Sequence, residues 1–211
     1  MTRQFEFVSA DDGQTYYLEL EHDEFAESPR QWDSFGTMLC WHGRYDLGDE
    51  NPYSDPMDFW EEWGLQGIED NEPDDLKWLP LSLYDHSGIT MKVGVLSGWD
   101  TGVVGFIYAT REDANKWGIA WDDVHNQLAL EVEAYDDYLV NGAQYAAIYT
   151  LDPNYSIEDV YGEYKYQAVM EQVDSCGGFY GLNTVNDCED ATEILNCMGW
   201  GVSSIRCLRE Y

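Results

Sequence analysis

The sequence predicts a single α+β domain over residues 1–211, with a mainly antiparallel sheet and one or two packed helices. Three observations lead to this prediction. Hydrophobic residues make up 44% of the chain and aromatic residues 15%, which supports a core and does not fit a disordered acidic tail. Short β-rich runs recur between turn residues. Segment 120–139 carries apolar residues at helical spacing, and no internal repeat or Gly/Ser linker divides the chain.

The first third of the chain predicts strands followed by an irregular acidic excursion. Segments 4–9 and 15–21 alternate apolar and polar residues around the turn signal ADDG, which is typical of a hairpin. Segment 34–42 predicts a third, more buried strand. Segment 46–75 has three prolines and many acids. It predicts one short helix, because Asp55 is a good N-cap and Pro56 suits the first turn.

The middle third predicts strands and then two helices. Segments 79–87, 89–96 and 102–110 are strand-like. Thr110 begins a near capping box with an acid three residues later, and Gly118 is expected to end that helix. The second helix covers 120–139, is expected to end at Asn141-Gly142, and is expected to pack on the sheet through an apolar stripe. The stripe consists of Trp121, Val124, Leu128, Val132, Tyr135 and Leu139.

The last third predicts a hairpin, a helix and a strand. Segments 144–151 and 161–176 read as hairpin strands around a long loop. The sequence CGGFYG at 176–181 is expected to be a glycine-rich turn. Segment 186–199 predicts a short helix, and 202–208 predicts a final strand.

The triplet Asp85-His86-Ser87 places an acid, a histidine and a serine side by side. Neighbouring strand residues point to opposite faces, so the three side chains cannot form a hydrolase relay by themselves. Asp, Ser and Gly between two β-rich runs favour a hairpin turn. The alternative is that His86 pairs with a remote acid for catalysis or metal binding.

Other chemistry-bearing patterns are sparse. Cys40 and His42 would share one face of a strand and could supply two metal ligands, although a packed Cys beside a hydrogen-bonded His is the more common case. The five cysteines lack CxxC spacing, so reduced thiols are expected, and a bridge within 188–207 stays open. No EF-hand, phosphate loop or zinc-protease motif occurs. The sequence therefore predicts no catalytic residue, no metal site and no cofactor.

Charge is the strongest global signal. The chain has 42 acidic and 10 basic residues and a net charge of -32. Such a chain repels nucleic acid and anionic membranes, which bind cationic surfaces. The expected partner is cationic: a basic protein surface, metal ions or a very salty solvent. Without an apolar stretch for a membrane span or a secretory signal, the sequence predicts a cytoplasmic protein.

The helix at 120–139 has many acids and no basic residue, and like charges three or four residues apart destabilise a helix. We expect its acids and those of the 46–75 excursion to form a continuous negative surface that binds the partner. The candidate residues are Asp49, Glu50, Asp55, Asp58, Glu61, Glu62, Asp122, Asp123, Glu131, Glu133, Asp136 and Asp137.

Four stretches resemble a family of mostly uncharacterised small acidic proteins carried by phages, plasmids and other mobile elements. They are PRQWDSFGTMLCWHGRYDLGDE (29–50), LYDHSGIT (83–90), GWDTGVVGFIYAT (98–110) and DSCGGFYG (174–181). The resemblance spans most of the chain and implies an accessory gene of a mobile element, but it carries over no catalytic residue. The charge level is similar to that of anti-restriction and anti-CRISPR DNA mimics.

Three hypotheses follow. In the first, a DNA mimic occupies the basic cleft of a DNA-binding restriction or CRISPR complex in the host, with Trp and Tyr as anchors. In the second, the chain belongs to a salt-adapted host or virus, and its charge serves hydration. In the third, the protein is an enzyme centred on His86 or on Cys40 and His42.

Overall fold

The computed structural model describes residues 2–86, 88–157, 169–181 and 187–210. Contacts divide the chain into two compact units. We call Glu27–Val140 the central unit, and Met1–Ala26 with Asn141–Tyr211 the split unit. The protein is α+β with antiparallel sheets, as the sequence predicts. The prediction of a single domain over residues 1–211 stays a prediction.

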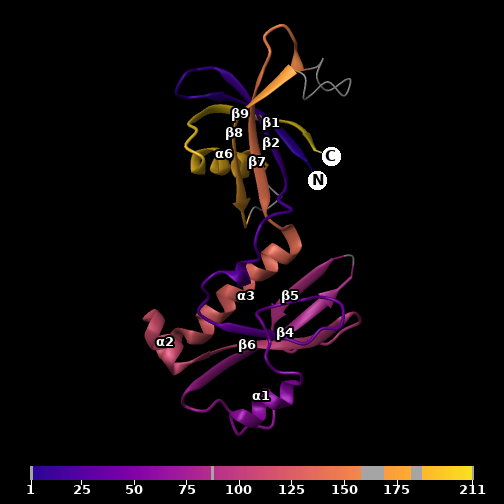
Figure 1. Ribbon diagram of the computed structural model, residues 1–211, viewed down its shortest axis with the longest axis vertical. Helices are drawn as coiled ribbons and strands as arrows, with labels where there is room; N and C mark the ends of the chain where they lie inside the picture. Colours follow the sequence, from indigo (N-terminus) through magenta and orange to yellow (C-terminus); the bar gives the residue numbers. More distant parts are fainter. Residues whose placement is uncertain (1, 87, 158–168, 182–186, 211) are drawn as a thin grey trace. The chain divides into compact units, whose positions relative to one another are not determined.

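The central unit contains a four-stranded antiparallel sheet in the order β3-β6-β4-β5. Helices α1, α2 and α3 and two short 3-10 turns, η1 and η2, complete the unit (Figure 1). The bounds are η1 Pro29–Gln31, β3 Thr37–Cys40, α1 Pro56–Glu62, β4 Leu76–Asp85, β5 Ile89–Val93, β6 Thr101–Thr110, α2 Arg111–Trp117, η2 Trp121–Asp123 and α3 Val124–Asn141.

Helices α3 and α1 cover opposite faces of this sheet (Figure 1). The predicted stripe of α3 packs on one face, where Val124, Leu128, Val132 and Tyr135 are buried against strand residues such as Ile107. On the other face, α1 inserts an aromatic cluster that includes Phe59, Trp60, Trp78 and Phe106. Neighbouring strand residues such as Phe106 and Ile107 therefore serve different cores, as strand alternation requires.

Local sequence signals set the helix ends of the central unit. Asp55 caps α1 by accepting the Met57 N–H at 2.8 Å. Thr110 and Asp113 form the predicted capping box of α2, and Gly118 ends that helix with a φ of 70°. A left-handed φ of this kind favours glycine. The predictions of both helices are confirmed.

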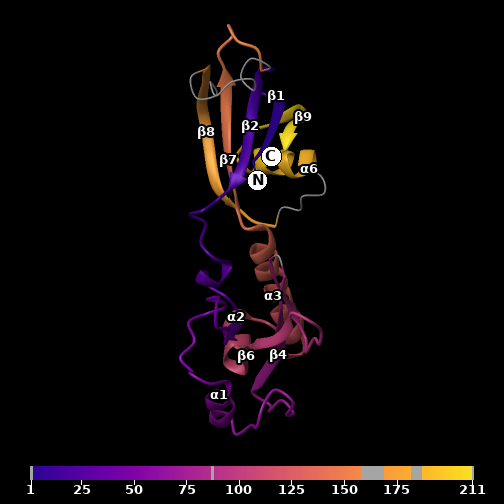
Figure 2. The same ribbon diagram turned by 90° about the vertical axis from the view of Figure 1, so that its right-hand side faces the viewer.

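The split unit is a five-stranded antiparallel sheet in the order β8-β7-β2-β1-β9, with helix α6 against one face (Figure 2). Phe5, Phe7, Leu18 and Leu20 face Ile194 and Leu195 of α6 and form the core of this unit. The bounds are β1 Arg3–Ser9, β2 Thr15–His22, β7 Gln144–Leu151, β8 Met170–Phe179, α6 Asp187–Cys197 and β9 Val202–Glu210.

One prediction in the split unit is wrong. Residues 176–179 of the expected glycine-rich turn are instead the last residues of β8. The strand accommodates them through a register shift opposite Gln144 and Ala146, and Gly178 takes a φ of 74° there. Part of the strand predicted at 161–176 lies outside the described residues. No helix in the described part of the chain is long and apolar enough to cross a membrane.

Candidate functional site

The predicted Asp85-His86-Ser87 turn joins β4 to β5. Asp85 pairs with Ile89, and the His86 N–H donates to the Gly88 carbonyl at 3.1 Å, so the segment is a hairpin turn; Ser87 lies outside the described residues. His86 Nδ1 lies 3.3 Å from Asp100 Oδ2, and the two side chains are 65% and 50% exposed. His86 thus meets a remote acid, but both side chains are largely open to solvent, and it is Asp100 rather than His86 that lines the pocket beside the hairpin.

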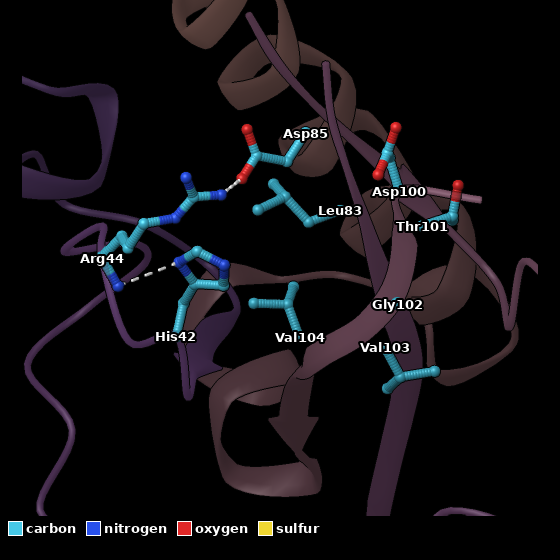
Figure 3. A pocket seen from close by; sticks show the side chains of 9 residues that line it. All are labelled: His42, Arg44, Leu83, Asp85, Asp100, Thr101, Gly102, Val103 and Val104. Carbon is cyan, nitrogen blue, oxygen red and sulfur yellow. Dashed lines mark hydrogen bonds and ion pairs between the residues drawn. The ribbon is translucent and has the colours of Figure 1, made fainter. Parts of the chain in front are cut away.

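This polar pocket has a volume of about 320 Å³ (Figure 3). His42 and Arg44 line it from one side, and Asp85 and Asp100 from the other. Arg44 forms an ion pair with Asp85, and His42 Nδ1 accepts the Arg44 and Tyr45 backbone N–H groups at 3.4 and 3.3 Å. This acceptor role places the proton of a neutral His42 ring on Nε2. Within the pocket, Arg44 therefore balances the charge of Asp85.

Cys40 and His42 both line a second pocket, of about 470 Å³, but β3 ends at Cys40, so His42 lies outside the strand on which the two were expected to share a face. Burial and, to a smaller degree, the charge of Asp49 together raise the pKa of the Cys40 thiol to about 12. The thiol therefore stays protonated near neutral pH, whereas nucleophiles and metal ligands need the thiolate. Among the described residues, no group of three or more His, Cys, Asp or Glu is placed to hold a metal ion.

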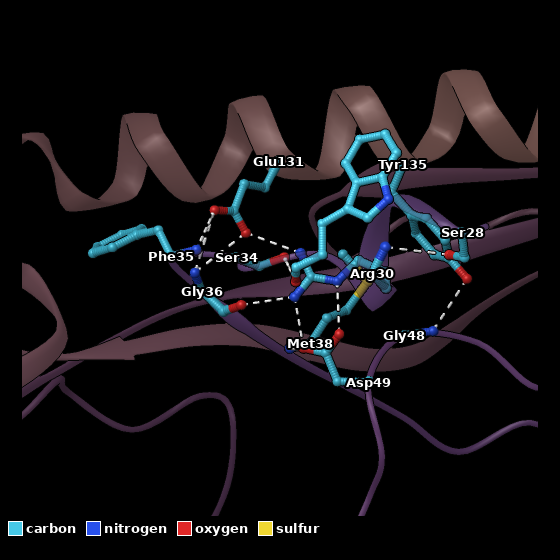
Figure 4. Close-up of polar contacts among 11 residues, drawn as sticks. Ser28, Arg30, Ser34, Phe35, Gly36, Met38, Gly48, Asp49, Glu131 and Tyr135 are labelled. Carbon is cyan, nitrogen blue, oxygen red and sulfur yellow. Dashed lines mark hydrogen bonds and ion pairs between the residues drawn. The ribbon is translucent and has the colours of Figure 1, made fainter. Parts of the chain in front are cut away.

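Arg30 is the centre of a buried polar network (Figure 4). It bridges Asp49 and Glu131, which the sequence places on the exposed negative surface, and it also donates to the Gly36 carbonyl at 2.7 Å. Burial alone would lower the pKa of Arg30, but hydrogen bonds and charges from the two acids raise it overall. Asp49 and Glu131 also accept backbone N–H groups, including that of Met38 at 2.7 Å.

Asp136 is a second structural acid. It is 7% exposed and accepts the Met91 N–H at 2.6 Å and the Lys92 ammonium at 2.5 Å, so it ties α3 to β5. The prediction that Asp136 lies on an exposed face is therefore wrong. Its position on the helix turns Asp136 toward the sheet. Its partner Lys92 lies 44 residues earlier in the chain, so the sequence gives no sign of the pairing.

At least five of the ten basic side chains bind carboxylates within the protein. They are Arg30, Arg44, Lys92, Arg111 and Arg206. Each of these five cations is paired with a specific acid. Because the chain has 42 acidic and only 10 basic residues, most acids cannot have a basic partner of their own. The candidate site is where those remaining acids gather.

The outer side of α1 and the loop after it carry such acids. We define the acidic face as the exposed residues Asp55, Asp58, Glu61, Glu62, Glu69 and Asp70. Residues 46–75 contain no Lys or Arg. Phe59 and Trp60 hold α1 on the sheet, so the acids on its other side point to solvent. Glu61 and Glu62 lie three and four residues after Asp58, a spacing at which like charges destabilise a helix.

The acids predicted on the 120–139 helix lie apart from the acidic face. Asp122, Asp123 and Glu133 are exposed, but they belong to η2 and α3, which pack on the sheet face opposite α1. Asp137, also on α3, is partly exposed, and Glu50 is exposed beside Asp49. The helices that carry the two sets pack on opposite faces of the four-stranded sheet, although Arg30 brings Asp49 and Glu131 together, and one continuous surface from both sets stays a prediction. The sequence analysis missed the structural roles of Arg30 and Lys92. The one signal in the sequence was that 10 basic residues stand among 42 acidic ones, so each basic residue could be expected to meet an acid.

No family model, no curated protein and no solved structure matches this chain. The resemblance to acidic proteins of mobile elements stays a prediction. The residues of the acidic face and the surface around them are thus the basis for a functional proposal.

Proposed function

We propose that this protein is an acidic interaction protein that occupies the basic, DNA-binding cleft of another protein with its acidic face. A host restriction or CRISPR complex is the target class that we propose, and the chain would act there as an inhibitor encoded by a mobile element. This function requires no catalytic residue in this chain.

One observation carries the proposal: the acids of the acidic face are exposed and are not neutralised by any Lys or Arg of their own segment. Their mutual repulsion destabilises the folded protein, while acids such as Asp49 and Asp136 are each paired with a cation. A partner that normally binds phosphates would offset this repulsion on binding. Competition with DNA follows, since both ligands need the same basic groups.

Electrostatics sets the expected behaviour of such a complex. Complementary charge accelerates association and makes it sensitive to salt. A surface that replaces DNA phosphates should lose affinity steeply between low and moderate salt, as DNA itself does. Exposed aromatic and apolar side chains near the acids would add contacts that salt does not weaken.

The test compares two double charge reversals. Glu61→Lys with Glu69→Lys alters the acidic face, and Asp122→Lys with Glu133→Lys makes the same charge change on the opposite side of the sheet. Each protein is added to purified restriction or CRISPR complexes, and binding of labelled DNA is followed at several salt concentrations. We expect the unaltered protein and the opposite-side variant to displace DNA, and the acidic-face variant to do so weakly through a slower on-rate. Equal behaviour of both variants, or no displacement from any such complex, would contradict the proposal.

A further inference from the structure

An apolar cleft of about 420 Å³ opens beside the acidic face, between α1 and β6. Met57 and Trp60 of α1 line one side, Val103 and Phe106 of β6 line the floor, and Ile68 closes the cleft from the loop after α1. The lining is thus mainly aliphatic and aromatic, which is typical of a site that takes an apolar group.

The cleft is open because α1 covers only part of its sheet face. A β-bulge between Leu81 and Ser82 shifts the register of β6, and Val103 comes to lie opposite Ser82. Val103 is 49% exposed and Met57 is 43% exposed, so apolar surface at the mouth of the cleft faces solvent. The short helix buries Phe59 and Trp60 but leaves these two side chains uncovered.

Apolar surface continues from the cleft along the same sheet face. The Leu96 N–H donates to Ser82 Oγ at 3.0 Å, which holds Leu96 over Ser82. Tyr84 lies two residues further along β4 and therefore points to the same side as Ser82. Leu96 is 46% exposed and Tyr84 is 42% exposed. An extended chain segment could therefore lie across this face with one side chain in the cleft.

The charge around the cleft decides which kind of chain segment can bring an apolar side chain to it. Asp55 and Asp58 directly flank Pro56 and Met57, and Glu69 and Asp70 directly follow Ile68. The α1 and loop residues that line the cleft are therefore next in sequence to exposed carboxylates, with no Lys or Arg in residues 46–75. This setting repels acidic segments and attracts basic ones.

We propose that the cleft anchors a leucine-like side chain from a basic segment of the partner protein, while Lys and Arg on either side of that residue bind the acidic face. The inference rests on the proposed function and adds to it a specificity element that DNA mimicry by charge alone lacks. Apolar burial supplies affinity that salt does not weaken, whereas the surrounding charges supply rate and orientation.

The experiment uses two synthetic peptides of equal charge, in which Lys and Arg surround either a Leu-Leu pair or a Ser-Ser pair. Dissociation constants are measured by calorimetry with the full chain, at low and moderate salt. We expect the Leu-Leu peptide to bind at least about tenfold more tightly, because it buries an apolar side chain. The advantage should disappear in the variant Met57→Ser with Val103→Ser. It should persist in Leu130→Ser, which removes a half-exposed leucine from α3 on the other side of the sheet.

The outcomes separate the cleft from the acidic face. Equal, salt-sensitive binding of both peptides would overturn the anchoring proposal and leave the acidic-face proposal standing. No binding of either peptide would count against both. A neutral peptide with the same Leu-Leu pair that binds as tightly as the basic one would also overturn the proposal, because the cleft would then be a site for uncharged ligands.

Discussion

The Arg30 guanidinium donates two hydrogen bonds to the Asp49 carboxylate: Nε lies 2.8 Å from Oδ1, and Nη2 lies 2.6 Å from Oδ2. Arg30 is nearly fully buried and also binds Glu131, which lies 101 residues away in sequence. Arg30 thus joins the segment before β3, the loop after β3 and helix α3. Its two partners, Asp49 and Glu131, are acids that the sequence analysis assigned to a partner-binding surface.

Removal of Arg30 should strongly destabilise the protein. Arg30→Met leaves Asp49 and Glu131 without their cation in a mostly buried site, and losing one member of such a pair typically costs about 3–5 kcal/mol. Urea unfolding followed by tryptophan fluorescence measures the change. The control Arg44→Ala breaks an ion pair whose arginine is 68% exposed, and it should cost less than about 1 kcal/mol. Similar losses in the two variants would show that Arg30 is not a structural centre.

Asp136 and Glu133 should respond in opposite ways to truncation. Asp136→Ala leaves the Met91 N–H without its acceptor, and we expect a loss of about 1–3 kcal/mol or more in the free energy of unfolding. Glu133→Ala removes an exposed acid from the same helix and should be neutral or slightly stabilising, because it lowers like-charge repulsion. Thermal unfolding at matched salt distinguishes the two, and a tolerated Asp136→Ala would contradict the assigned role.

Two glycines of β6 form a matched pair for packing. A Cβ on Gly105 would collide with the backbone carbonyl oxygen of Leu39 on the neighbouring strand, which cannot move aside cheaply. Gly105→Ala should therefore cost about 3 kcal/mol or more in the free energy of unfolding. Gly102 has open space at the same position, so Gly102→Ala should stay within about 0.5 kcal/mol. Equal stability of the two variants would rule out the close approach of β3 and β6.

Local signals could be read from the sequence, and long-range pairings could not. The capping box of Thr110, the stop at Gly118 and the buried stripe of α3 each depend on residues within one or two turns. The partners of Arg30 depend on how strands and helices are arranged. The CGGFYG segment misled because glycine also permits a bulge within a strand, as at Gly178.

The candidate site was predictable in kind but not in extent. Composition indicates an acidic surface, and the exposed acids of α1 agree with that prediction. Periodicity alone cannot say that α1 and α3 lie on opposite faces of a sheet or that Lys92 neutralises Asp136. The apolar cleft was also hidden, because it combines Met57 with Val103 from a strand far along the chain.

The Cys40 thiol should make stability depend on pH in alkaline solution. Its pKa is raised to about 12 in the folded protein, mainly by burial, whereas an unfolded cysteine has a pKa of about 8.5. The folded state thus prefers the neutral thiol. Its contribution is fully present below about pH 8.5 and is lost as pH rises toward about 12. Between about pH 9 and 11, the free energy of unfolding should fall by up to about 1.4 kcal/mol per pH unit more steeply than in Cys40→Ala.

Reactivity offers an independent check on the same thiol. Cys176 and Cys197 are exposed, whereas Cys40 lies partly buried between β3 and the residues around Asp49. A thiol reagent at neutral pH should label Cys176 and Cys197 within minutes and Cys40 only when the protein unfolds. Peptide mapping after a short pulse identifies the labelled sites. Rapid labelling of Cys40 in folded protein would contradict its assignment as a protonated, protected thiol.

Salt should affect stability and binding in opposite directions, and this contrast separates mimicry from salt adaptation. The hydrophobic cores do not depend on charge screening, and the ion pairs of the largely buried Arg30 and Asp136 side chains are screened little, so we expect the fold to persist at about 10 mM salt. Added salt should then raise the free energy of unfolding modestly, because it screens repulsion within the acidic face, while affinity for a basic target falls. Circular dichroism and the peptide titration can be run on the same samples. A chain adapted to salt would instead lose its spectrum below about 1 M salt, because screening of exposed like charges matters most there. That loss would count against the acidic face as a docking surface and would favour hydration as the reason for the charge.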